Sequence, residues 1–174
     1  HSAFRRQRQM CIRDSDLIMN VLDNLQECPK NNCHFDFERR NLILDDHNEV
    51  NVIDFQDMCI APIGIDIAGI LLDHYMSFDR SIIKKNLKYF LDRSEISLSE
   101  DDLFEFFRWS GIQRNMRILG TLANLYCDEG RDFRLKDLPN ILSNLTNLIP
   151  DQHNSRSFFE DKVKNKLNER LAAL

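Results

Sequence analysis

The sequence predicts a mostly helical α+β domain that carries one small β-hairpin. Only 5 glycines and 4 prolines occur in 174 residues, well below the roughly 12% that these two residues make up in an average protein. This shortage of helix-breaking residues favours helices. Two short apolar runs, 42–44 and 50–53, flank a polar turn at 45–48, which is the pattern of a hairpin.

The composition is that of an ordinary globular domain. Hydrophobic residues make up 43% of the chain and charged residues 29%, and the net charge is −5. An acidic chain argues against a general nucleic-acid partner, and no apolar run approaches the roughly 20 residues that span a membrane. The five cysteines are odd in number and irregularly spaced, so we expect reduced thiols and a cytoplasmic location. The sequence does not indicate an oligomeric state.

The first fifteen residues differ from the rest of the chain. They are rich in arginine and lack both helical and strand periodicity, and residues 5–15 resemble a translated sequencing adapter. We therefore expect residues 1–15 to be a disordered scar, residues 16–174 to form the domain, and the natural protein to continue upstream. The alternative is a basic arm that binds nucleic acid or a membrane surface. The abrupt change to an acidic chain at Asp16 favours the scar.

Helical spacing of apolar residues predicts six further elements. The sequence after Ser99 begins with three acidic residues, as at a capped helix start, and an interruption is expected near Gly111. Pro139 is expected near the start of its helix. The last segment carries an apolar stripe at four-residue steps that we expect to dock on the core. The predicted helices cover residues 17–25, 65–75, 81–91, 99 to about 126, 135–148 and 157–174.

Three polar side chains flank the predicted hairpin. Asn41 and Asp54 lie at the same end of its antiparallel strands, and Asp36 lies in the loop just before it. Carboxylate and amide oxygens gathered in this way suit Mg²⁺, which takes one or two protein ligands and completes its shell with phosphate oxygens. The alternative is that each residue only caps a turn, as Asp and Asn commonly do. Their joint spacing favours the magnesium site.

The spacing of these residues resembles a known family. His34, Asp36 and Asn41 follow the pattern His-x-Asp-x-x-x-x-Asn, and Asp54-Phe55 follows the hairpin, as in the kinase motifs H-R-D-x-x-x-x-N and D-F-G. The chain thus resembles the protein-kinase-like phosphotransferases that include aminoglycoside and choline kinases. The resemblance implies the carboxy-terminal lobe of the protein-kinase-like fold. Gln56 replaces the glycine of D-F-G, which fits the small-molecule branch.

A closer resemblance is to the bacterial cell-wall amino-sugar kinases. It rests on Asp54-Phe55-Gln56-Asp57 with Pro62, and on Trp109-Ser110-Gly111-Ile112-Gln113-Arg114 with Leu119-Gly120. These enzymes use ATP and Mg²⁺ to phosphorylate the anomeric hydroxyl of N-acetylmuramate or N-acetylglucosamine in cell-wall recycling. The resemblance therefore implies a small-molecule sugar as the substrate.

The resemblance also implies roles for individual residues. Asp36 would be the catalytic base, His34 would brace the catalytic loop, and Asn41 with Asp54 would hold Mg²⁺ on the ATP phosphates. Asp66, in a segment (60–68) with a proline and a downstream Asp-x-Ala, would support the same loop.

Four residues are weaker candidates for the sugar site. Asp57 and Gln113 could contact the sugar, and Arg114 could hold a lactyl carboxylate with its bidentate fork or form an internal salt bridge instead. Trp109 could stack on a sugar ring or lie in the core, and the core is favoured.

The family's amino-terminal lobe carries a phosphate-covering loop and a strand lysine that cannot be placed before Cys33. We therefore expect this fragment to bind ATP poorly, to be inactive by itself and to expose an apolar face. The alternative functions are a kinase of another small alcohol (an aminoglycoside, choline or homoserine), a non-catalytic kinase-like binding module, and a zinc module built from Cys28, Cys33, His34 and Cys59.

Overall fold

The fold is seen in a computed structural model that describes residues 2–72 and 79–173, with side chains from Ser15 onward. It is mostly helical, with two small antiparallel sheets. In chain order the elements are α1 (Ser2–Glu27), β1 (Lys30–Cys33), the 3₁₀ turn η1 (Arg39–Asn41), β2 (Leu42–Leu44), β3 (Val50–Val52), β4 (Cys59–Pro62), α2 (Gly64–Leu71), α3 (Arg80–Leu91), α4 (Glu100–Glu129), η2 (Leu135–Asp137), α5 (Leu138–Leu148), α6 (Ser155–Ser157), the π-helical turn η3 (Phe158–Val163) and α7 (Lys164–Leu171).

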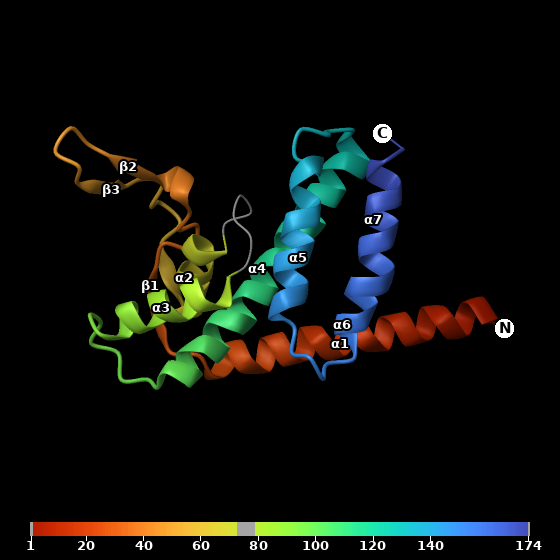
Figure 1. Ribbon diagram of the computed structural model, residues 1–174, viewed down its shortest axis with the longest axis horizontal. Helices are drawn as coiled ribbons and strands as arrows, with labels where there is room; N and C mark the ends of the chain where they lie inside the picture. The colour runs from red at the N-terminus through yellow and green to blue at the C-terminus, as the bar shows by residue number, and fades with distance from the viewer. Residues whose placement is uncertain (1, 73–78, 174) are drawn as a thin grey trace.

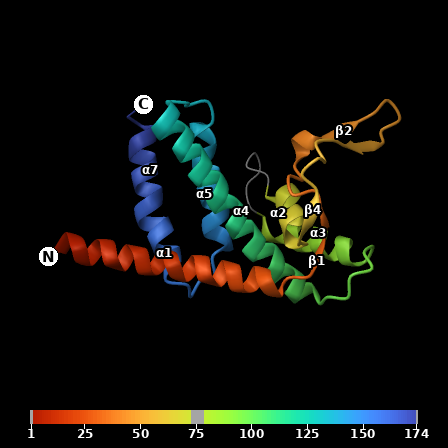
Figure 2. The ribbon, with the colours of Figure 1, turned by 180° about the vertical axis from the view of Figure 1, so that it is seen from behind.

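The helices form a body from which the hairpin projects. Helices α4, α5 and α7 run side by side, and α1 crosses their ends (Figure 1). Seen from behind, the β2–β3 hairpin and the amino terminus of α1 lie at opposite ends of the molecule (Figure 2). The loop between β1 and β2 is thereby held where the hairpin leaves the helical body.

The predicted hairpin is confirmed, and a second strand pair accompanies it. Strands β2 and β3 pair from Leu42 with Val52 to Leu44 with Val50. Strands β1 and β4 pair from Lys30 with Pro62 to Cys33 with Cys59. Sequence analysis missed β1 because its residues, Lys-Asn-Asn-Cys, have low strand propensity. This second pair fixes both ends of the segment that contains the predicted site.

The core is built mainly where α2, α4 and α5 meet, with one face of α1 added. Its apolar side chains are almost fully buried, and they include Leu17, Ala68, Leu72, Phe107, Ile112, Leu145 and Leu148. Trp109 is 7% exposed and belongs to the same cluster. The favoured interpretation of Trp109 as a core residue is therefore confirmed.

Helix α4 starts as predicted but has no interruption. The Ser99 hydroxyl accepts a hydrogen bond from the Asp102 amide at 3.0 Å and caps the helix. The expected break near Gly111 is wrong, since α4 continues to Glu129. A Cβ at Gly111 would lie 2.4 Å from Leu72 Cδ1 and 2.8 Å from Leu148 Cδ1. This glycine thus allows two leucines to approach the helix closely, and it does not end it.

The carboxy-terminal stripe docks on the core, as expected. Phe159, Val163 and Leu167 are half-buried against the main cluster. The segment is not one regular helix, because a π-helical turn separates α6 from α7. The expectation that Pro139 lies near the start of its helix is also confirmed, since it lies in the first turn of α5.

Two further segments need separate comment. The predicted helix 65–75 is observed as Gly64–Leu71, and residues 73–78 lie outside the described part of the chain. Residues 2–15, expected to be a disordered scar, form the first part of helix α1. Their origin as a scar stays a prediction. Among the helices described, none is long and apolar enough to cross a membrane.

Two glycines give opposite predictions for stability. A Cβ at Gly64 would lie 2.4 Å from Ser110 Oγ and 2.5 Å from the Phe106 carbonyl oxygen of α4. Gly64→Ala should therefore push α2 off α4 and lower the free energy of unfolding by about 1–3 kcal/mol. Gly120 lies in α4 with open space around it, so Gly120→Ala should raise that free energy by up to about 1 kcal/mol.

Urea unfolding of both variants tests the α2–α4 contact. An unchanged midpoint for Gly64→Ala would contradict it, and Gly120→Ala serves as the matched control.

Candidate active site

The predicted site lies in the loop between β1 and β2, and one carboxylate holds the start of this loop. Asp66, in the first turn of α2, accepts hydrogen bonds from the backbone amides of His34 at 2.6 Å and Phe35 at 2.8 Å. Phe35 has a φ of 70°, a left-handed conformation that is unfavourable for a bulky residue. The bonds from His34 and Phe35 to Asp66 help to hold the backbone in this conformation.

His34 connects this loop to the segment after the hairpin. Its ring is buried, and Nε2 lies 2.8 Å from the carbonyl oxygen of Ile53. The Phe37 ring packs beside it, with ring centroids 5.9 Å apart. Ile53 directly precedes Asp54, whose φ of 65° is also left-handed. His34 thus fixes the backbone from which the Asp54 side chain departs.

Asn41 joins the other end of the loop to Asp36. Its side-chain amide donates to the Asp36 carbonyl oxygen at 2.8 Å and to Asp36 Oδ2 at 3.4 Å. Its own carbonyl oxygen accepts from the Ile53 amide at 3.0 Å. Asn41 is buried, so the loop, the start of β2 and the residue before Asp54 are joined at one polar residue.

A chain of charges surrounds Asp36. Arg40 donates to Asp36 Oδ2 at 2.8 Å and pairs with Glu38 Oε2 at 3.1 Å. Glu38 also pairs with Arg114 of α4. Because Arg114 is only 4% exposed, this ion pair is buried and anchors the loop to the helix. Arg114 thus forms the internal salt bridge that was the alternative interpretation, and its contact with a substrate carboxylate stays a prediction.

These charges set the protonation of Asp36. Partial burial raises the pKa of its carboxyl group. The hydrogen bond and charge of Arg40, with smaller effects of Asn41 and Arg114, lower this pKa by more than burial raises it. The net pKa lies below the ordinary value of an aspartate, so Asp36 is ionised at neutral pH. Its Oδ1 oxygen accepts no hydrogen bond from the residues described.

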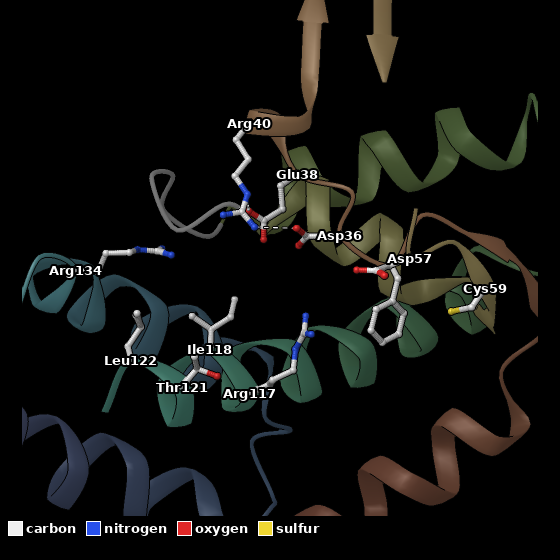
Figure 3. Close-up of a pocket in the computed structure, with 11 residues that line it drawn as sticks. Asp36, Glu38, Arg40, Asp57, Cys59, Arg117, Ile118, Thr121, Leu122 and Arg134 are labelled. Carbon is white, nitrogen blue, oxygen red and sulfur yellow. Dashed lines mark hydrogen bonds and ion pairs between the residues drawn. The ribbon is translucent and has the colours of Figure 1, made fainter. Parts of the chain in front are cut away.

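Asp36 opens into a pocket of about 580 Å³ between the loop and α4. Figure 3 shows Asp36, Glu38 and Arg40 on one side of this pocket and Arg117 and Arg134 entering from the other. The pocket is lined by Phe35, Asp36, Glu38, Arg40, Asp57, Cys59, Arg117, Ile118, Thr121, Leu122 and Arg134. It is large enough for a monosaccharide.

The structure brings most of the predicted site residues together, but not all of them. His34, Asp36, Asn41, Asp54 and Asp66 come together around the loop, and Asp57 lies on the pocket wall. Gln113 is half-buried on α4 and does not line the pocket.

Sequence analysis missed Arg117, Thr121 and Arg134 as pocket residues. Arg117 and Thr121 lie one and two turns beyond Arg114 on the same helix, so helical spacing could have pointed to the first two.

The loop also offers oxygen donors for a cation. The Asn41 side-chain oxygen accepts no hydrogen bond from the described residues. Asp54 is exposed, and its Oδ1 accepts from Gln56 at 2.6 Å. One amide and one carboxylate oxygen match the ligands that Mg²⁺ prefers.

The cysteines fit a metal less well. Cys33 and Cys59 are register partners in the β1–β4 pair. Burial, with the nearby Asp66 carboxylate, raises the pKa of the Cys33 thiol to about 11, which disfavours the thiolate that zinc requires. In the part of the chain that the structure describes, no three His, Cys, Asp or Glu side chains are arranged to hold a metal.

The residues of this loop lie within a segment that matches a known family. The sequence profile of the phosphotransferase enzyme family matches residues 2–99, more than half of the chain. Over 145 residues the chain is 28% identical to the N-acetylmuramate/N-acetylglucosamine kinase of Neisseria meningitidis serogroup B, covering 80% of this chain and 42% of that protein.

Two kinases with the same name come from Pseudomonas. Identity is 25% over 134 residues for Pseudomonas putida, covering 74% of this chain and 39% of the relative. It is 29% over 118 residues for Pseudomonas aeruginosa, covering 65% and 35%. The chain therefore spans about two fifths of the length of the curated relatives that it matches, and the family resemblance seen in the sequence is confirmed.

Asp66 should be essential for the shape of the loop. Asp66→Ala removes the acceptor of the His34 and Phe35 amides, and hydrogen bonds to a charged group contribute about 1.5–3 kcal/mol each. We expect the free energy of unfolding to fall by about 3–6 kcal/mol and the exchange of both amide hydrogens to accelerate. Hydrogen-exchange NMR measures both amides, and Asp57→Ala, which removes an exposed carboxylate, is the control. Unchanged exchange in Asp66→Ala would contradict the role of Asp66.

Arg40 should control the ionisation of Asp36. In Arg40→Gln the effect of burial is offset only by Asn41 and Arg114, so the pKa of Asp36 should rise. In the native chain the folded-state pKa is depressed. The stabilising effect of the pair is therefore present above the unfolded pKa of about 4 and is lost as the pH falls through the folded-state value.

Carboxyl ¹³C NMR during a pH titration measures this shift, and Arg93→Gln, an exposed arginine just after α3, is the control. An Asp36 titration curve that is the same in the native chain and in Arg40→Gln would rule out the pairing as its cause.

Proposed function

This chain belongs to the phosphotransferase enzyme family, and from that premise we propose that residues 16–174 form the carboxy-terminal lobe of an ATP-dependent amino-sugar kinase of the bacterial cytoplasm. It transfers the γ-phosphoryl group of ATP to the anomeric hydroxyl of N-acetylmuramate or N-acetylglucosamine in cell-wall recycling. The observation that carries the proposal is the pocket of monosaccharide size that the half-buried Asp36 lines. The printed names of the three relatives support the choice of sugar.

Asp36 orients the sugar hydroxyl. Arg40 and Asn41 both donate to Oδ2, which leaves Oδ1 to accept a hydrogen bond from the substrate. The sugar hydroxyl oxygen attacks the γ-phosphorus of ATP, and the bond between this phosphorus and the oxygen that leaves with ADP breaks. The hydroxyl proton passes to Asp36 Oδ1. A low pKa makes Asp36 a weak base, which suits a reaction in which positioning contributes more than proton abstraction.

Asn41 and Asp54 are the residues that would hold Mg²⁺. When bound, this cation neutralises charge on the ATP phosphates. His34 positions both ligands, because its ring bonds to Ile53 between the hairpin and Asp54, and the Ile53 amide in turn bonds to Asn41. Asp66 positions His34 through the backbone.

Apolar side chains on the hairpin and just after it are exposed. Leu44 is 65% exposed, Val50 60% and Phe55 62%. Exposed apolar side chains gathered on a projecting hairpin and the segment after it are typical of a surface that another unit covers. The amino-terminal lobe of the family is the unit we propose, and the chain alone is expected to transfer little phosphate.

A chimera provides the test. The segment of the Neisseria meningitidis kinase that the chain matches is replaced by the corresponding residues of this chain, and phosphorylation is followed by ³¹P NMR. Asp36→Asn should lower turnover by about 10²–10⁴-fold, the usual contribution of a positioned acid–base group. Asp46→Asn, an exposed carboxylate in the hairpin turn, should leave turnover unchanged.

A substrate panel with N-acetylmuramate, N-acetylglucosamine, choline and kanamycin identifies the acceptor. Phosphorylation of choline or kanamycin alone would refute the sugar assignment. Full turnover by the Asp36→Asn chimera would refute the assigned role of Asp36.

A further inference from the structure

Arg117 differs from the other arginines of the pocket. Arg40 pairs with Asp36 and Glu38, and Arg134 pairs with Asp137. The guanidinium of Arg117 lies over the ring of Phe35, 5.6 Å from its centroid, and forms no ion pair with any carboxylate of the described residues. It is therefore a positive charge at the pocket that no carboxylate of these residues neutralises.

Arg117 lies three residues after Arg114, on the wall that α4 contributes to the pocket. Arg114 is buried on Glu38, whereas Arg117 is exposed and reaches into the pocket toward the side that holds Asp36 and Asp57 (Figure 3). The same helix thus uses one arginine to anchor the loop and presents the next one to whatever fills the pocket.

The position of Arg117 on Phe35 suits the recognition of a carboxylate. An arginine that stacks on an aromatic ring uses the face of its guanidinium, and the N–H groups in its plane stay available for a bidentate contact. Asp36 and Asp57 would repel an anionic acceptor that entered the same pocket. A nearby cation without an ionic partner offsets that repulsion.

The two sugars of the proposed function differ in this respect. N-acetylmuramate carries a lactyl carboxylate, whereas N-acetylglucosamine has a neutral hydroxyl at the same ring position. We propose that Arg117 is the specificity-determining residue that binds the carboxylate of the acidic sugar. This proposal rests on the proposed function, since it takes the pocket to be the acceptor site.

The test compares the binding of both sugars to this chain by NMR titration at low and high salt. The native chain should bind N-acetylmuramate about tenfold more tightly than N-acetylglucosamine, as expected for one hydrogen-bonded charge pair. Arg117→Gln should abolish this difference without changing the affinity for N-acetylglucosamine. Arg117→Lys should keep part of it, and high salt should reduce it.

Arg131→Gln is the matched control, because Arg131 is exposed, pairs with Glu129 and lies outside the pocket. It should leave the preference intact. Equal binding of the two sugars by the native chain, or the same loss of affinity for both sugars in Arg117→Gln, would overturn the assignment of Arg117. Neither result would contradict the proposed function. If neither sugar shifts the pocket resonances, the assignment of the acceptor site fails, and the proposed function fails with it.

Discussion

The site depends on one carboxylate that lies outside it. Asp66 accepts hydrogen bonds from the backbone amides of two successive residues, His34 and Phe35. It thereby fixes the direction in which the chain leaves β1. Everything that follows in the loop takes its position from this turn, including the left-handed Phe35 and the side chain of Asp36. Helix α2 carries Asp66 and packs tightly on α4 through Gly64. The core of the helical body is thereby connected to the geometry of the loop.

A second anchor acts through charge. Arg114 reaches from α4 to Glu38, and Glu38 shares Arg40 with Asp36. A buried ion pair contributes little net stability, but removing one partner leaves a costly unpaired charge. Such a pair therefore holds the loop in one arrangement. The close approach of Gly69 to the Phe37 carbonyl oxygen, 2.4 Å from where a Cβ would lie, has the same effect through packing.

Much of this arrangement could be predicted from the sequence, because periodicity and short motifs are local signals. The Ser99 cap, the 42–52 hairpin and the grouping of Asp36, Asn41 and Asp54 all follow from residues close together in the chain. The failures concern distant contacts. In a sequence, a glycine such as Gly111 is compatible with a helix break or with close packing. The second applies here because Leu72 and Leu148, both distant in sequence, pack against it. Likewise, the burial of Arg114 and the exposure of Arg117 depend on where the loop crosses α4.

The central claim is that the pocket beside Asp36 receives the sugar hydroxyl that is phosphorylated. A crystal structure of the chain with bound N-acetylmuramate tests it most directly. The account predicts the anomeric oxygen at hydrogen-bond distance, about 2.6–3.2 Å, from Asp36 Oδ1, with the sugar between the loop and α4. A sugar bound in this pocket with its anomeric oxygen turned away from Asp36, or bound at another surface, would contradict the account.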